Sequence, residues 1–174
     1  LGVFAVFFYP HLHKLFAERG WQLLILVMLI RPISQVFPRF TWLRYVMMLR
    51  KELGIIAWAL LLAHGLGFFL QMGISPFAIF TDASYWNFKE MMAWGIIGAI
   101  VCIPLVATSN LFSMKIFGGT WKWIQRLSYV LFISGGIHVI LLKPRDMIET
   151  IVPMLIWIVL WILAQSKVVI WKAK

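Results

Sequence analysis

Residues 53–72, with the sequence LGIIAWALLLAHGLGFFLQM, decide the class of fold. The stretch contains no charged side chain, and a helix of this length crosses the hydrocarbon core of a bilayer, which is about 30 Å thick. Its interior holds one histidine, His64. A polar side chain at membrane depth is costly and usually has a function. The stretch therefore predicts a transmembrane helix that carries a functional histidine.

The composition extends this prediction to the whole chain. Apolar residues make up 63% of the sequence and charged residues 13%, whereas soluble domains carry roughly 25% charged residues. The ten tryptophans and four tyrosines are typical of membrane interfaces. The basic residues behind the net charge of +10 lie in gaps between apolar runs. This placement indicates contacts with anionic lipid headgroups and argues against nucleic acid as a partner.

Apolar runs along the chain predict an all-α integral membrane bundle of about six transmembrane helices, which forms one domain over residues 1–174. The runs cover residues 1–9, 21–37, 53–72, 91–108, 121–142 and 147–164. The first run is short and ends at Pro10, so it is expected to be the second half of a truncated helix. The lone cysteine, Cys102, excludes an internal disulfide and a cysteine-ligated iron–sulfur site.

Lysines and arginines in alternate connections predict the orientation of the bundle. Three segments carry most of them: Arg39, Arg44, Arg50 and Lys51, then Lys115, Lys122 and Arg126, and finally Lys167, Lys172 and Lys174. We expect these segments and both termini on the cytoplasmic side of a bacterial inner membrane. The third and fifth predicted helices then run in the same direction, from the inside to the outside.

His64 and His138 lie inside these two helices at similar depth. At 1.5 Å of rise per residue, His138 is roughly 7–8 Å and His64 roughly 10 Å from the outer end of its helix. Two neutral imidazoles that face each other across a bundle suit the axial positions of a heme iron. The residues alone also leave open a hydrogen-bonded structural pair, a proton relay or a site for another metal.

Gly65, Gly135 and Gly136 adjoin the two histidines and are candidate cofactor-contacting residues. Glycine lets a flat macrocycle approach a helix backbone, but it also lets two helices pack closely without a cofactor. Both interpretations remain open for these three positions.

Other polar residues have simpler interpretations. His11 and His13 are expected to be solvated in the first outer connection, with a surface metal site or a partner contact as the alternative. Arg31 is expected to extend to the inner interface rather than to pair with a heme propionate. Arg126 lies at the inner surface, and contact with a quinone or flavin headgroup is its alternative interpretation.

Several motifs resemble the ferric-reductase-like transmembrane domain family. They are RKELG at residues 50–54 with His64 ten residues after the glycine, ATSN at 107–110, and GTW at 119–121 followed by Gln125, Tyr129 and His138. The resemblance covers roughly residues 20–142. In particular, the chain resembles the heme-binding membrane subunits of bacterial periplasmic methionine sulfoxide reductase systems.

The resemblance implies a b-type heme with His64 and His138 as axial ligands of the iron. Family members typically have a histidine at the position of Gln125, and that histidine is associated with a second, inner heme. Gln125 is a poor iron ligand, and residues 53–63 contain no histidine. We therefore expect one heme, in the outer half of the bundle.

The expected function is electron transfer through this heme between a quinone or partner protein and an acceptor on the outer side. We expect no nucleotide- or flavin-binding domain within these 174 residues. The chain is thus expected to be an oxidoreductase subunit rather than a complete enzyme, with a partner redox protein or a larger membrane complex. The alternatives are a non-catalytic subunit that scaffolds a respiratory or photosynthetic complex, and a proton path or transporter that uses the two histidines.

Overall fold

A computed structural model describes residues 9–170, and every element in this range is helical. The elements are η1 (Pro10–Leu12), α2 (His13–Val36), α3 (Trp42–Met72), α4 (Ala78–Thr81), η2 (Ala83–Trp86), α5 (Met91–Ala107), α6 (Leu111–Phe117), α7 (Gly119–Leu142), η3 (Pro144–Asp146) and α8 (Met147–Gln165). The first apolar run lies almost entirely outside the described residues.

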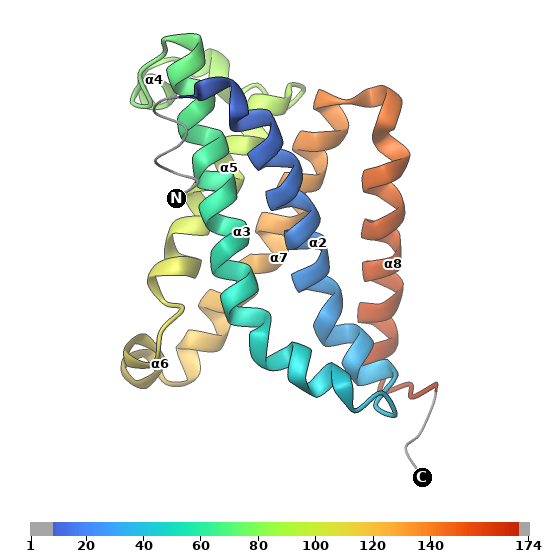
Figure 1. Cartoon of the computed structure of the whole chain (residues 1–174). Helices are drawn as coiled ribbons and strands as arrows, with labels where there is room; N and C mark the ends of the chain where they lie inside the picture. Colours follow the sequence, from blue (N-terminus) through green and yellow to red (C-terminus); the bar gives the residue numbers. More distant parts are fainter. Residues whose placement is uncertain (1–8, 171–174) are drawn as a thin grey trace.

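The five long helices stand side by side as an up-and-down bundle (Figure 1). α2, α5 and α8 run in one direction, and α3 and α7 run in the other. The helices that contain His64 and His138 are therefore parallel, as the order of the predicted spans requires. The connection with α4 and η2 lies at the end of the bundle where α3 ends and α5 begins.

Three of the described helical segments are long and apolar enough to cross a membrane: α3, α7 and the segment Pro144–Gln165, which contains α8. α5 and α6 bend by 91° at the break between them and add a fourth span if they are counted together. α2 is not among the candidates, and it carries Lys14, Glu18, Arg19 and Arg31. The all-helical multi-pass bundle is confirmed, whereas the count of about six spans is not.

Two helices begin earlier than their apolar runs predict. α2 starts at His13 instead of residue 21, and α3 starts at Trp42 instead of residue 53. The added turns of α3 contain Arg44, Arg50 and Lys51. Arginine and lysine are charged but are good helix formers, so the helix extends beyond the apolar run. Hydropathy thus located the part of each helix suited to lipid and missed its polar extension.

The core lies between α2, α5, α7 and α8. Its buried members are Trp21, Leu24, Met28, Cys102, Leu105, Leu131, Phe132 and Trp157. Phe132 is at its centre, stacked on Trp21 at 5.4 Å between ring centroids and met edge-on by Trp157 at 5.2 Å. Elsewhere the apolar side chains face outward: only 11–22% of the residues in the apolar windows of the three candidate spans are buried. Apolar surface of this extent fits lipid rather than water.

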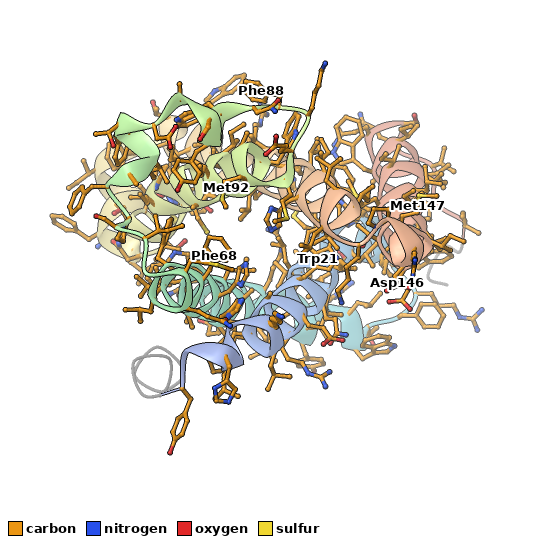
Figure 2. All side chains as sticks on the ribbon, turned by 90° about the horizontal axis from the view of Figure 1, so that it is seen from above. Trp21, Phe68, Phe88, Met92, Asp146 and Met147 are labelled. Carbon is orange, nitrogen blue, oxygen red and sulfur yellow. The ribbon has the colours of Figure 1, made fainter. Side chains whose placement is uncertain are left out.

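The bundle is organised as two closely packed helix pairs. α2 packs mainly on α3, and α5 packs mainly on α7, while α3 and α5 contact each other sparingly. Figure 2 looks along the bundle and shows an opening among the drawn side chains, bordered by Trp21 of α2, Phe68 of α3 and Met92 of α5. The opening lies between the two pairs, where the candidate site is found.

Candidate functional site

His64 of α3 and His138 of α7 face each other between the two helix pairs. Their ring centroids are 6.3 Å apart, and the ring planes are inclined by 61°. Both side chains are half-buried. Because α3 and α7 are parallel and each histidine lies in the last third of its helix, the rings meet at the end of the bundle where α2 and α5 begin.

A backbone carbonyl holds each imidazole. The Nδ1 atom of His64 is 3.2 Å from the carbonyl oxygen of His13, and Nδ1 of His138 is 2.8 Å from that of Met91. A carbonyl oxygen only accepts, so in both rings Nδ1 donates and the neutral imidazole keeps its lone pair on Nε2. Metal-binding histidines are commonly oriented in this way. The first residues of α2 and α5 thereby fix the tautomer of both candidate ligands.

The 6.3 Å between the ring centroids places the two imidazoles close enough that a single bound metal centre could contact both. The described part of the chain contains no group of three or more His, Cys, Asp or Glu side chains that could hold a metal ion. A two-ligand site beside an opening suits a heme iron, since the macrocycle supplies the remaining ligands.

His13 belongs to this site, and its prediction as a solvated loop residue was wrong. It is buried, with 5% of its surface exposed, and its ring stacks on His64 at 5.5 Å between centroids and 23° between planes. α2 begins at His13, so the side chain lies on the helix face that also carries the buried Gly20 and Val27. The seven-residue spacing of these three positions was the signal in the sequence. His11 is exposed, as expected.

The glycines near the two histidines have different surroundings. A Cβ at Gly135 would lie 3.1 Å from Cζ3 of Trp21, and one at Gly136 would overlap Sδ of Met154. These two glycines let α7 pack closely on α2 and α8, which agrees with the interpretation of close helix packing. A Cβ at Gly65 would have no neighbour within 4 Å.

Gly95 of α5 is a site residue that the sequence interpretation missed. A Cβ there would lie 2.9 Å from Nδ1 and 3.0 Å from Cε1 of His138, closer than real contacts of this kind. The absence of a side chain lets the imidazole lie against α5, within reach of the Met91 carbonyl. Gly95 stands in an apolar run. Its spacing of one helical turn from Met91, which places both residues on the same face of the helix, was the signal for this site residue in the sequence.

Gln125 takes part in a contact between α7 and the end of α5. Its Nε2 donates to Oγ1 of Thr108 at 3.0 Å and approaches the carbonyl oxygen of Leu105 at 3.4 Å. Trp121 Nε1 donates to the carbonyl of the same threonine at 2.8 Å. The position at which the family resemblance would place an inner histidine therefore holds an amide engaged in helix–helix hydrogen bonds.

Fold and site together define an all-helical membrane protein with an intramembrane pair of carbonyl-anchored histidines. The chain belongs to the family described as ferric reductase like transmembrane component, whose model matches residues 19–136. This match confirms the resemblance carried by the motifs.

Curated relatives agree with the family match. The chain is similar to the protein-methionine-sulfoxide reductase heme-binding subunit MsrQ of Rhizobium meliloti, with 31% identity over 132 residues, 75% of this chain and 56% of that protein. It is 32% identical over 142 residues to the protein of the same name from Brucella anthropi, covering 81% of this chain and 60% of the relative. The chain thus spans somewhat more than half the length of these relatives. No solved structure matches it.

Proposed function

We propose that this chain is a membrane b-type cytochrome subunit that transfers electrons through one heme, with His64 and His138 as axial ligands. The observation that carries the proposal is the facing imidazole pair at 6.3 Å, each ring anchored through Nδ1 to a backbone carbonyl. Membership in the ferric reductase family and the heme-binding name of the relatives support it.

The protein's contribution is to present two Nε2 lone pairs in fixed orientation. The carbonyls of His13 and Met91 hold the tautomers, the ring of His13 supports one face of His64, and Gly95 lets His138 lie close to α5. A bound heme supplies one-electron redox chemistry, and its ligands and surroundings set the potential.

We further propose that the site holds a single heme in the outer half of a bacterial inner membrane, with both termini cytoplasmic. The hydrogen bonds of Gln125 to the end of α5 support a single site, because this amide takes the place of an inner ligand. The excess of lysine and arginine in alternate connections supports the orientation. The electron partner is a redox protein, a quinone or a larger complex, as the subunit name of the relatives suggests.

Visible spectroscopy of the purified protein tests the proposal. The dithionite-reduced protein should show the α-band of a low-spin b-type heme, and the pyridine hemochrome assay should give about one heme per chain. His64→Ala and His138→Ala should each abolish the band, whereas His11→Ala, which changes an exposed histidine, should keep it. A protein without heme would favour the scaffold alternative, and a band that survives His138→Ala would refute the ligand assignment.

Electron transfer needs its own measurement. The heme should be reduced by a quinol analogue or a flavin reductase system and reoxidised by an added acceptor, in a reaction that His138→Ala removes. A heme that binds as described but exchanges no electrons with any donor would leave the chain a structural cytochrome and refute the proposed function.

A further inference from the structure

A second candidate site lies at the opposite end of the bundle from the histidine pair. Arg31 of α2 and Arg50 of α3 line the same pocket, which is bounded by α2, α3, α7 and α8. Its other lining residues are Met28, Pro32, Gln35, Tyr129, Trp157, Trp161 and Gln165. Arg31 is 18 residues from His13, or about 27 Å along α2, so this pocket is separate from the heme site.

Within residues 9–170, no acidic side chain forms an ion pair with either guanidinium group. Arg50 Nε donates to the carbonyl oxygen of Val27 at 3.1 Å, which leaves the terminal nitrogens of Arg50 for other acceptors. Arg31 and Arg50 repel each other electrostatically. In the described part of the chain, the ion pair found is Lys51 with Glu52, and it involves neither arginine. Arg50 is half-buried and Arg31 is exposed beside it, so a bound anion would relieve the repulsion between the two positive charges.

The shape of the pocket limits what this anion can be. Its enclosed space is about 10 Å³, enough for a group about the size of one water molecule. A planar multi-ring ligand does not fit inside. The pocket opens where Arg31, Gln35 and Gln165 are exposed on the surface of the bundle, beside the partly exposed ring of Trp161. These features suit an oxyanion that lies at the mouth of the pocket beside Arg31 and directs at most one oxygen inward.

We propose that the mouth of this pocket binds the phosphate of an anionic phospholipid headgroup. Phosphate oxygens accept charge-assisted hydrogen bonds from arginine, and the single negative charge of a phosphodiester offsets part of the charge of the two guanidinium groups. Gln35 and Gln165 supply neutral donors at the rim, and the lipid chains lie along the apolar outer surface near Trp161. Basic pockets between transmembrane helices bind anionic headgroups in this way.

Lipid-dependent thermal unfolding of the full chain in a neutral detergent tests this proposal. Phosphatidylglycerol should raise the unfolding temperature in a saturable way, because a ligand that binds only the folded protein stabilises it. Phosphatidylcholine and inorganic phosphate should have little effect. Native mass spectrometry should retain about one phosphatidylglycerol per chain.

The variants identify the site. Arg31→Gln should weaken the phosphatidylglycerol effect by at least about fivefold, as expected for one lost charge at a headgroup. Arg31→Lys, which keeps the charge, should retain most of the effect, and so should Arg44→Gln, which removes an exposed arginine of α3 outside the pocket. All three variants should keep the heme band, so the result is independent of the proposed redox function.

Three results would overturn the proposal. Equal stabilisation by phosphatidylcholine would show a general lipid effect, and equal stabilisation by inorganic phosphate would show a free-anion site. Identical behaviour of Arg31→Gln and Arg44→Gln would show that the bound lipid does not use this pocket.

Discussion

Replacement of Gly95 by alanine should displace the ring of His138. A Cβ at this position would lie 2.9 Å from Nδ1 of His138, whereas ordinary van der Waals contact begins at 3.4 Å, so the ring or α5 must move by about 0.5 Å. The ring edge concerned is the one that donates to the carbonyl of Met91 at 2.8 Å. The substitution therefore acts on the orientation of a candidate heme ligand without touching the ligand itself.

The size of the effect follows from the type of contact. Loss of a group that orients a metal-binding histidine typically lowers metal affinity by about 10–100-fold, and overpacking costs about 1–3 kcal/mol. We expect Gly95→Ala to weaken heme binding by about tenfold or more, measured by hemin titration of the apoprotein at the Soret band. The spectrum of the bound form should also change, because the imidazole is tilted.

Gly98→Ala is the matched control on the same helix. A Cβ at Gly98 would lie 3.3 Å from Oγ of Ser134, a contact that a small adjustment relieves, and it does not touch His138. This variant should bind heme nearly as the unchanged protein does. Equal affinity and identical spectra for Gly95→Ala and Gly98→Ala would refute the close packing of His138 on α5.

Two further predictions concern groups away from the histidine pair. Gln125→Leu should remove the hydrogen bond to Thr108 and lower the free energy of unfolding by about 1 kcal/mol, whereas the heme band should persist. Thermal unfolding measures the first effect and a visible spectrum the second. Loss of the heme band would contradict the single-heme assignment. Hydrogen bonds from Ser84 lower the pKa of the exposed Asp82, so the cap of η2 is in place above the ordinary aspartate pKa and is lost as the pH falls through the lowered value. The midpoint of the Ser84 amide shift in an NMR titration should lie below the ordinary aspartate value, and a midpoint at or above that value would contradict the cap.

Much of the fold was predictable because hydropathy and charge are local properties of the chain. The apolar runs located α5, α7 and α8 to within a few residues at each end. The order of the spans fixed the parallel course of α3 and α7 and so the shared depth of His64 and His138. Hydropathy failed where helices continue beyond their apolar part, as in the first turns of α2 and α3.

The sequence by itself determined the membrane bundle, the direction of its helices and the level at which two histidines stand. Only the tertiary structure decided which groups surround them: the stacked ring of His13, the carbonyl of Met91 and the bare backbone of Gly95. It also turned Gly135 and Gly136 toward neighbouring helices. The physical reason is that the depth of a side chain follows from the rise per residue along its own helix. The direction in which that side chain points depends on the rotation of the helix about its axis. That rotation is set by packing between residues far apart in the chain.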